Sequence, residues 1–540
     1  MSKKLFAIFV FCLLNVANAY KILVYSTTFS KSHIVSNARI ADVLAKDGHD
    51  VTLLELHYEE KPGVIEASKH AKLWRETFEW PDRDDMGDWE GFINSMFHAH
   101  SVYESHFENA KYHERYVKAC DCLLNNTNFI EKMKTQKFDV FIGEQLTMCG
   151  SGISHLAGIK VHIWLSSCPV GIHFASLIGL PFEASYVPAV YENDQLGDVL
   201  TFRQRVTNLL RTISNYIGFV DGIDDTTALF RKRFGRDFPD IKQIVGESPL
   251  VLAAIDEFLD FPRPTSPRVL NIGGLGLRDL AGELKTLNGT EFADQMTKGK
   301  LGVVFFSLGS MVPTQMLPKN VMSNILKAFN NLKDYHFIVR TDKENKVAEE
   351  IASTMSNVFL TTWAPQLDIL AHDRLKLFIT HGGYNSILEA ARLAVPIVGV
   401  GIFGDQPSNS LMAERNGWGI SFNKADLLRT HETFEKTIRE ALESRTLREG
   451  AKRAQKLFLT RPMSAEERIT KYMRFLEAND GRLPELRPRS VYMLFWEKHN
   501  LDIWACAFVA VFIVGFVSLW IVLKVIKLAA GSDSEKKKRE

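Results

Sequence analysis

Short apolar runs alternate with amphipathic stretches along most of the chain, and this alternation predicts strands and helices that take turns. Residues 22–25 form a continuous apolar run that is typical of a buried strand. Residues 32–46 carry apolar side chains at helical spacing, and a second apolar run follows at 51–54. These three segments predict a β-α-β unit with parallel strands.

The same alternation continues through both halves of the chain. Residues 138–142 and 161–165 are further candidate strands of the first half. The proline-rich stretch 260–267 indicates a linker, and residues 303–306 open the second half with another strand. Two such halves predict an α/β protein with two doubly wound, Rossmann-like domains that face a cleft.

The segment 199–217 has a basic amphipathic pattern. Such a helix can lie on a membrane surface. A helix packed on its own domain, with the apolar stripe toward the core, is the more common arrangement and is what we expect here. The apolar residues on or near one face are Leu200, Val206, Leu209, Leu210 and Ile213.

Both ends of the chain carry apolar segments. Residues 1–19 combine two lysines with a short apolar run and a small-x-small end, which is the pattern of a signal peptide. An uncleaved anchor is the alternative, although the run is short for a bilayer. Residues 503–523 are almost wholly apolar and reach about 30 Å as a helix, which is one membrane crossing.

Positive charge follows the second apolar segment and sets its orientation. Lys524 and Lys527 predict a cytoplasmic tail and a lumenal body, the topology of a type I single-pass protein. Lys537 and Lys538 resemble the dilysine retrieval signal of endoplasmic reticulum membrane proteins, so we expect the protein in that membrane. A simple stop-transfer cluster is the alternative explanation of the two lysines.

If the body of the protein is lumenal, its Asn-x-Thr sequons can be glycosylated and its cysteines can form disulfides. Asn125 and Asn288 each begin an Asn-x-Thr sequon and are predicted glycosylation sites. An oxidising lumen favours disulfides, but the sequence does not fix the pairing. The cysteines outside the two apolar end segments are Cys120, Cys122, Cys149 and Cys168.

Composition excludes few classes of protein. A hydrophobic fraction of 46% and a charged fraction of 24% are ordinary for a globular protein. The formal net charge of +1 gives no reason to expect a nucleic-acid partner. Cysteine and histidine spacings show no zinc pattern, so no metal is expected.

The most informative stretch of the chain covers residues 378–409. It reads as a strand, a glycine turn, a helix from about 385 to 393, a strand and a loop. The N-terminus of such a helix attracts phosphate, and Gly382 and Gly383 let the backbone approach it closely. His381 is expected to donate a charge-assisted hydrogen bond to a phosphate oxygen.

This stretch closely resembles the donor-sugar motif of the family 1 UDP-glycosyltransferases, in particular the membrane-bound UDP-glucuronosyltransferases. The resemblance extends to Trp363-Ala364-Pro365-Gln366 upstream and covers about residues 20 to 530. It implies the two-domain GT-B fold, with last helices that cross back to the first domain near residues 466–476. It also implies a UDP-sugar as co-substrate and no cofactor.

Pattern and resemblance together divide the chain into six parts. They are a signal peptide (1–19), an acceptor-binding domain (20–275), a UDP-sugar-binding domain with crossing helices (276–480), a juxtamembrane segment (481–502), a transmembrane helix (503–523) and a cytoplasmic tail (524–540).

The resemblance assigns donor-binding roles residue by residue. Each role suits its side chain, since an indole offers a flat face to a base and a carboxylate accepts hydrogen bonds from a diol. Trp363 and Gln366 are assigned to uracil, Ser310, His381, Gly382, Asn385 and Ser386 to the diphosphate, Glu389 to the ribose, and Asp405 and Gln406 to the sugar.

Glycosyl transfer also needs a base for the acceptor hydroxyl. His33 lies in the first turn of the first helix, where the positive helix terminus should keep its ring neutral. The family carries a His at this place, in a Ser-His pair like Ser32-His33. The position of the family's assisting Asp is occupied by Glu144, which keeps the charge but adds a methylene.

These residues predict an inverting hexosyltransferase that acts on hydroxyl groups of small lipophilic acceptors. UDP-glucuronate is the leading donor and UDP-glucose the alternative, while the acceptor and any assembly of several copies stay open. A non-catalytic type I membrane protein that only binds is a second class. A nicotinamide-dependent oxidoreductase is disfavoured because residues 25–34 contain no glycine.

Overall fold

The computed structural model describes residues 19–27, 31–57, 67–78, 89–98, 100–181, 183–189, 196–277, 284 and 286–536. These residues divide into two compact units, one that ends at Arg487 and one that begins at Pro488. The predicted signal peptide up to residue 18 and the Lys537-Lys538 pair lie outside the described residues.

The described strands of the first half form a seven-stranded parallel sheet in the order β3-β2-β1-β4-β5-β6-β7. The chain begins at the central strand β1, runs outward to β3 and then continues on the other side from β4. This is the doubly wound topology that the sequence predicts. The strands are β1 (Lys21–Thr27), β2 (Asp50–His57), β3 (Lys72–Thr77), β4 (Val140–Glu144), β5 (Val161–Ser166), β6 (Val251–Ala253) and β7 (Val269–Asn271).

The second half repeats this plan with six described parallel strands in the order β10-β9-β8-β11-β12-β13. Here β8 is the central first strand, and β11 begins the return on its other side. The strands are β8 (Gly302–Ser307), β9 (Tyr335–Arg340), β10 (Val358–Thr361), β11 (Leu375–Thr380), β12 (Ile397–Gly399) and β13 (Gly419–Ser421).

Helices cover both faces of each sheet, because the strands bury side chains in both directions. Along β1, Ile22 and Val24 belong to one hydrophobic cluster while Leu23 and Tyr25 belong to another. Strand β8 alternates in the same way. Such two-sided burial is the rule for parallel sheets.

The helices of the first half are α2 (Lys31–Lys46), α3 (Trp89–Ser95), α4 (Val102–Asn125), α5 (Thr127–Gln136), α6 (Cys149–Leu156), α7 (Ile172–Leu177), α8 (Phe202–Phe234) and α9 (Ile241–Gly246). Those of the second half are α10 (Glu291–Thr297), α11 (Lys319–Asn331), α12 (Lys346–Ala352), α13 (Gln366–Leu370), α14 (Tyr384–Arg392), α15 (Gln406–Arg415), α16 (Glu432–Glu443), α17 (Arg445–Thr460) and α18 (Ala465–Ala478). Short 3₁₀ turns cover Thr314–Met316, Lys424–Leu428, Pro484–Leu486 and Arg489–Tyr492.

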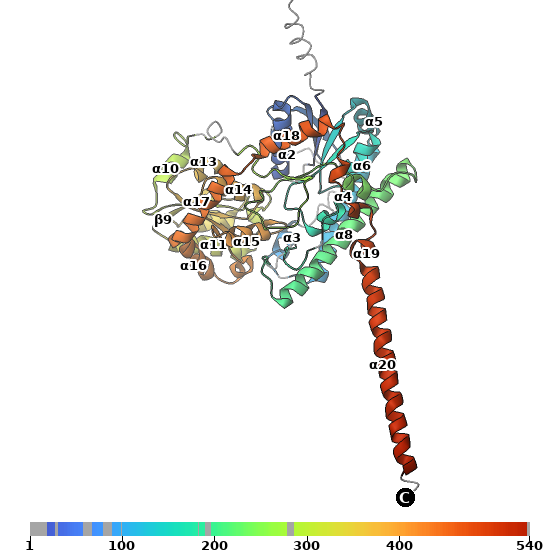
Figure 1. The fold of residues 1–540 in the computed structure, drawn as a ribbon. Coiled ribbons are helices and arrows are strands. Elements are labelled where there is room, and N and C mark those ends of the chain that lie inside the picture. The colour runs from blue at the N-terminus through green and yellow to red at the C-terminus, as the bar shows by residue number, and fades with distance from the viewer. Residues whose placement is uncertain are drawn as a thin grey trace, which may run out of the picture. The chain divides into compact units, whose positions relative to one another are not determined.

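Helix α18 returns to the first half, as the family resemblance implies. Ile469 and Met473 are fully buried in the same cluster as Ile22 of β1. Arg474 pairs with Asp47, the residue that follows α2, and Figure 1 shows α18 beside α2. The end of the second half is therefore part of the hydrophobic core of the first.

Helix α8 corrects one expectation. It packs on its domain, but through polar and small residues such as Asn208, Arg211 and Asn215, which are buried. Leu209, Leu210 and Ile213, which we expected to face the core, are exposed instead. Hydrogen bonds of Asn208 and Arg211 hold the helix in this orientation.

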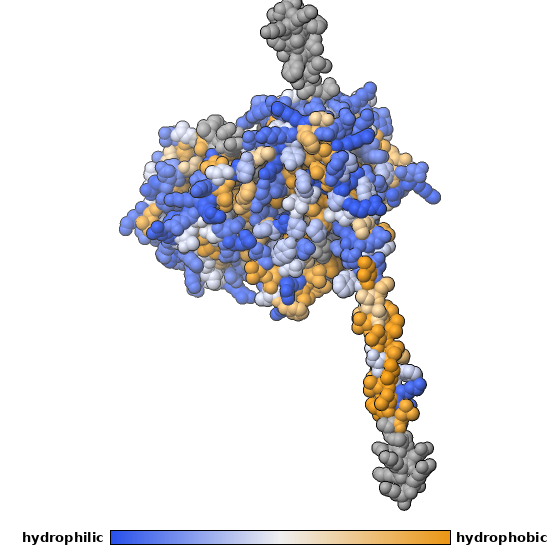
Figure 2. All heavy atoms as spheres, viewed as in Figure 1, coloured by the Kyte–Doolittle hydropathy of each residue, from blue (hydrophilic) through white to orange (hydrophobic). Residues whose placement is uncertain are grey.

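The second unit consists of α19 (Phe495–Lys498), α20 (Leu501–Lys536) and the 3₁₀ turn Arg489–Tyr492. Leu501–Leu528 is long and apolar enough to cross a membrane, and Figure 2 shows hydrophobic residues over most of its coloured length. The apolar segment predicted at 503–523 lies within this range.

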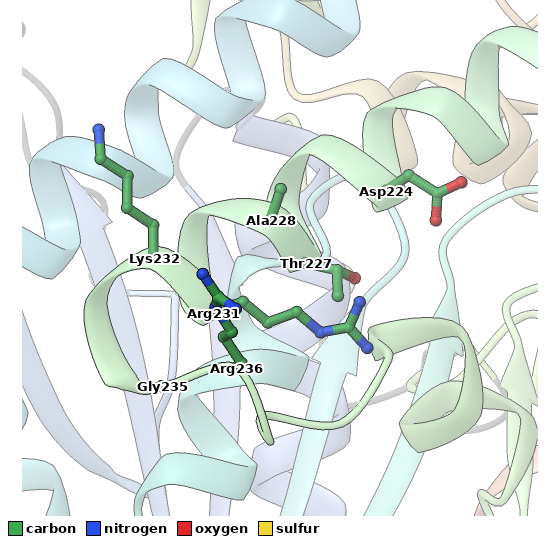
Figure 3. A pocket seen from close by; sticks show the side chains of 7 residues that line it. All are labelled: Asp224, Thr227, Ala228, Arg231, Lys232, Gly235 and Arg236. Atoms are coloured by element: carbon green, nitrogen blue, oxygen red, sulfur yellow. The ribbon is translucent and has the colours of Figure 1, made fainter.

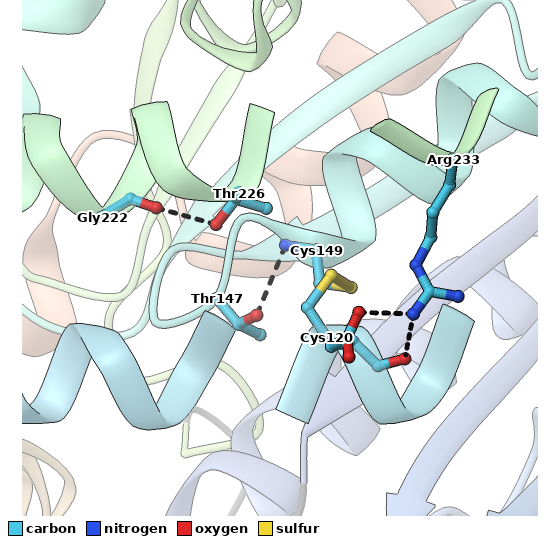
Figure 4. Close-up of a disulfide and its surroundings, with 7 residues drawn as sticks. Cys120, Thr147, Cys149, Gly222, Thr226 and Arg233 are labelled. Atoms are coloured by element: carbon cyan, nitrogen blue, oxygen red, sulfur yellow. Dashed lines mark hydrogen bonds and ion pairs between the residues drawn. A yellow bond between two sulfur atoms is a disulfide. The ribbon is translucent and has the colours of Figure 1, made fainter. Parts of the chain in front are cut away.

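One disulfide joins Cys120 near the end of α4 to Cys149 at the start of α6 (Figure 4). The sequence had left this pairing open. The bridge ties the long helix α4 to the segment that follows β4. Cys122 lies half-buried on α4 and is not part of this bridge.

We expect replacement of both bridged cysteines by serine to lower the free energy of unfolding by about 3–4 kcal/mol, because the bridge closes a loop with a sequence separation of 29 residues. Denaturant titration of the purified protein measures this loss. Cys122→Ser, on the same helix, is the matched control and should cost less than about 1 kcal/mol. Equal losses in both variants would contradict the stabilising role of the bridge.

Candidate functional site

The predicted base and its carboxylate meet at the point where the first sheet reverses its strand order. His33 stands in the first turn of α2, directly after the segment that follows β1. Glu144 is the last residue of β4, which pairs with β1 in parallel. Parallel strands end at the same edge of the sheet, and the place where strand order reverses is the usual ligand crevice of such folds.

The two side chains form a direct contact. His33 Nδ1 lies 2.9 Å from Glu144 Oε2, with the carboxylate fully buried and the imidazole 22% exposed. Glu144 also accepts from the Ser167 hydroxyl and from the Gln145 backbone N–H at 3.2 Å. A carboxylate accepts and does not donate, so it makes Nδ1 the N–H of His33 and leaves the lone pair on Nε2.

The Glu144 carboxylate also sets the protonation of His33. Burial by itself lowers the pKa of His33, but the charge and hydrogen bond of Glu144 outweigh it and raise the pKa above its usual value. The effect is opposite to the one that we expected from the helix terminus alone. The charge of Asp405, from the other half of the chain, acts on His33 in the same upward direction.

The predicted phosphate turn lies at the matching place in the second sheet. His381 follows β11, which pairs with β8 in parallel, and Gly309 follows β8. The His381 ring fits between two glycines: a Cβ on Gly309 would collide with it, and one on Gly383 would lie 2.6 Å from its Nε2. No larger residue could occupy either position without moving the ring.

His381 is neutral at pH 7 in this environment. Burial, helped by the charge of Arg340, lowers the pKa of His381 to about 4. Its Nδ1 is buried without a hydrogen-bond partner among the described residues. A neutral imidazole can still donate an N–H to a phosphate oxygen, and the charge of the phosphate then strengthens the bond.

Gly382 is required by its backbone conformation and by its neighbours. Its φ of +82° is in the left-handed region, and a Cβ there would lie 2.5 Å from Ser410 Oγ and 2.6 Å from the Gln406 carbonyl oxygen. Asn409 fixes the same turn by donating to the Gly382 carbonyl at 2.9 Å and to Asp405 at 2.8 Å. The turn and the start of α15 therefore form one connected unit.

The residues assigned to the nucleoside also come together. Gln366 at the start of α13 donates to Glu389 at 2.6 Å and to Ser386 at 3.1 Å, both on α14. Trp363 precedes α13 and is 69% exposed, so it is not a core tryptophan. An exposed indole three residues before Gln366 is a suitable surface for a base to stack on.

Hydrogen bonds hold the loop that the family resemblance assigns to the sugar. Gln406 accepts at its side-chain oxygen from the backbone N–H groups of Ile402 and Phe403, so its amide N–H₂ is left for a ligand. The buried Lys424 donates from behind to the Ile402 carbonyl, and burial lowers its pKa to about 7. Burial also raises the pKa of Asp405.

The two halves contact each other at the site. Asn385 in the first turn of α14 donates to Ser36 Oγ of α2 at 3.1 Å, one helical turn beyond His33. Helices α2 and α14, one from each half, therefore meet at their N-terminal ends. Ser310, which follows Gly309, is exposed, and among the residues that the structure describes its side chain forms no hydrogen bond with the other predicted ones.

Sequence reasoning missed several supporting residues: Ser167 on Glu144, Asn409 on the glycine turn, Arg340 beside Gly309, and Lys424 behind the sugar loop. Asn409 stands inside the motif, so its position was a signal that we did not use. The other three come from β9, from the segment after β5 and from a 3₁₀ turn, and only folding brings them to the site.

A hollow of about 690 Å³ at the end of α8 lies elsewhere. Figure 3 shows its lining, which comes from the last turns of α8 and the residues directly after it, with Arg231, Lys232 and Arg236 among them. None of the predicted site residues lines it, so it has no part in the site described above.

Comparison with known proteins identifies the family of the chain. The family model for "UDP-glucoronosyl and UDP-glucosyl transferase" matches residues 20–538. The chain belongs to the UDP-glycosyltransferase family. It is 34% identical to "Putative UDP-glucuronosyltransferase ugt-48" of Caenorhabditis elegans, over 97% of this chain and 98% of that one. It is 25% identical to UDP-glucuronosyltransferase 1-2 of Rattus norvegicus, over 91% and 89%.

Solved structures show the same fold. The glycotransferase of kitacinnamycin superposes with a TM-score of 0.57 at 18% identity, covering 86% of this chain and 99% of its own. UGT71G1 of Medicago truncatula, complexed with UDP-glucose, gives the same TM-score and coverage at 14% identity. The fold is therefore GT-B, and the protein is a UDP-glycosyltransferase enzyme.

Both predicted glycosylation sites are exposed. Asn125 ends α4 and accepts at its side chain from Arg233 at 2.9 Å, while Asn288 stands in a turn before α10. Among the residues with described positions, no group of three or more His, Cys, Asp or Glu side chains has the arrangement of a metal site.

We expect Gly382→Ala to weaken the binding of UDP at least tenfold, because the added methyl collides with Ser410 and Gln406 and displaces the turn. Isothermal titration with UDP measures this effect. Gly417→Ala is the matched control, since Gly417 has a similar φ of +74° but open space around it. Both variants share the backbone cost of about 1 kcal/mol. Equal UDP affinities would show that the turn does not hold the nucleotide.

Proposed function

We propose that this enzyme transfers glucuronic acid from UDP-glucuronate to a hydroxyl group of small lipophilic acceptors, with inversion at the anomeric carbon. The observation that carries the proposal is the contact of His33 with the buried Glu144, in a site that the charge of Asp405 reaches from the other half. An imidazole with a fixed Nδ1–H and a lone pair on Nε2 is suited to act as a general base.

The proposed step forms one bond and breaks one. The acceptor O–H gives its proton to His33 Nε2 while the oxygen bonds to the anomeric carbon. The bond from that carbon to the β-phosphate oxygen breaks, and UDP leaves with the electron pair. Glu144 stabilises the imidazolium that forms, and a single displacement inverts the anomeric carbon.

The charge that develops on UDP needs stabilising partners. The first turn of α14 offers backbone N–H groups and the positive end of the helix, and His381 and Asn385 stand beside it. We assign the diphosphate to this turn with Ser310, Gly382 and Ser386. Glu389 with Gln366 holds the ribose and uracil against Trp363, and Asp405 with Gln406 holds the sugar hydroxyls.

Glucuronate is the proposed sugar because the relatives over nearly the full length are named UDP-glucuronosyltransferases. UDP-glucose is the second candidate, since the matching family includes UDP-glucosyl transferases. The loop from Ile402 to Gln406 offers hydroxyl-binding groups that serve both sugars.

We also propose that Leu501–Leu528 crosses the endoplasmic reticulum membrane once, with the enzyme body in the lumen. The length and hydropathy of this helix support the crossing, and Lys524 and Lys527 at its end support the orientation. The disulfide between Cys120 and Cys149 fits an oxidising compartment. An enzyme anchored in this way meets acceptors that partition into lipid.

Membranes that carry the protein should form a glucuronide when given a simple phenol and a panel of UDP-sugars, with mass spectrometry as the readout. His33→Ala should lower this product at least a hundredfold while it binds UDP as well as the wild type. Product from UDP-glucose alone would replace the proposed sugar. Normal turnover by the His33 variant would overturn the base assignment, and no product with any donor would favour a binding protein.

The rate should depend on pH through His33, which must lose its proton to act. Activity therefore rises with pH through the pKa of His33, which Glu144 holds above the ordinary value of about 6.5. In Glu144→Gln the attraction is lost, so the pKa falls and the acidic limb of kcat/KM moves to lower pH.

Glu144→Gln should also lower kcat by about 10²–10⁴-fold, as for other catalytic imidazoles that lose their carboxylate. Glu144→Asp keeps the charge, so its acidic limb should stay near the wild-type position. An acidic limb at the same pH in the Gln variant would show that Glu144 does not control the protonation of His33.

A further inference from the structure

Helix α8 is amphipathic in an inverted sense: its polar face is buried and its apolar face is exposed. Asn208, Arg211 and Thr212 are almost completely buried. On the opposite side six large apolar side chains are between 40 and 75% exposed. These six are Phe202, Val206, Leu209, Leu210, Ile213 and Ile217, and we call them the apolar face of α8.

Hydrogen bonds fix the helix in this rotation. Asn208 donates to the carbonyls of Ala184 and Val187 at 2.7 and 2.8 Å, and accepts from the Ala189 N–H at 2.8 Å. Rotating the helix to bury the leucines would break these bonds and leave buried polar groups unpaired, which is costly.

The neighbouring helix α4 adds two more anchors. Arg211 donates to Ser105 Oγ at 2.9 Å and to the His100 carbonyl at 2.8 Å, and Asn215 accepts from Asn109 at 3.0 Å. The exposure of the apolar face is thus a consequence of well-satisfied polar packing and not of a poor fit.

The apolar face is a continuous stripe. From Phe202 to Ile217 it runs about 23 Å along the helix at 1.5 Å per residue. In Figure 2, hydrophobic residues are visible where Figure 1 shows the N-terminal end of α8. A continuous exposed apolar surface of this extent on a protein usually marks a binding surface.

The charge of α8 itself favours an anionic partner. Residues 199–220 contain no Asp or Glu, while Arg203 and Arg205 are exposed beside Phe202. The nearest preceding carboxylate, Asp198, is paired with Arg415. Apolar side chains flanked by arginines on one helix are the pattern of a helix that lies in a membrane interface.

If Leu501–Leu528 spans a bilayer, it also keeps the unit that ends at Arg487, here called the body, near that bilayer. The body ends at Arg487, so residues 488–500 allow a separation of at most about 45 Å. Such a tether gives the apolar face a high effective concentration of lipid. We propose that the apolar face of α8 docks on the surface of an anionic lipid bilayer, as a second membrane contact besides the spanning helix.

The test uses the full chain, inserted in phosphatidylcholine vesicles that contain phosphatidylserine, with a protease site engineered within residues 488–500. After cleavage, flotation measures how much of the body stays with the vesicles. The wild-type body should remain bound. It should be at least tenfold less retained after the triple change Val206→Glu, Leu210→Glu and Ile217→Glu, and also less retained by vesicles of phosphatidylcholine alone.

A matched triple variant places glutamates at three equally exposed apolar residues outside α8: Leu301→Glu, Leu459→Glu and Phe475→Glu. It should be retained like the wild type, and UDP binding confirms that both variants are folded. Three outcomes would overturn the proposal. They are release of the wild-type body as a monomer, release as a dimer that the α8 variant dissociates, and equal retention of the wild type and the α8 variant.

Discussion

The buried carboxylate of Glu144 is the constraint on which the His33 side of the proposed active site depends. A charge without solvent contact at the end of a strand is stable only with donors around it. His33, Ser167 and the Gln145 backbone supply them. They come from three segments of the first half, so the carboxylate fixes the place of α2 relative to β4. The same bond orients the His33 ring and raises its pKa, which joins stability to chemistry in one contact.

The glycine turn of the second half, to which we assign the donor diphosphate, follows a different principle. There the chain avoids charge in the turn itself and uses glycines, a neutral His381 and the free N–H groups of α14. Because phosphate carries its own negative charge, such a turn needs hydrogen-bond donors that approach the phosphate closely. These donors should already point toward it, so that they need not reorient when it binds. Asn409 donates to the Gly382 carbonyl of the turn, and Lys424 donates to the Ile402 carbonyl of the neighbouring loop.

Two packing choices shape the rest of the molecule. Helix α18 completes the core of the first half, so the two sheets are linked by more than the proline-rich segment. Helix α8 buries polar side chains that form hydrogen bonds, such as Asn208 and Arg211, and its apolar face stays exposed. Periodicity locates such an apolar stripe but does not say which face the protein buries, because that depends on the partners that neighbouring segments offer.

The sequence by itself determined both doubly wound halves and the glycine turn, and its family resemblance indicated the returning helix near residues 466–476 and the candidate residues of the site. Apolar runs, glycines and a long family motif are local signals. It did not reveal the short strands β6 and β7, the pairing of Cys120 with Cys149 or the rotation of α8. Only the tertiary structure brought Ser167, Arg340 and Lys424 to the site and reversed the expected shift of His33. Each of these depends on a charge or hydrogen bond from a segment distant in the chain, and burial and pairing exist only once the chain is folded.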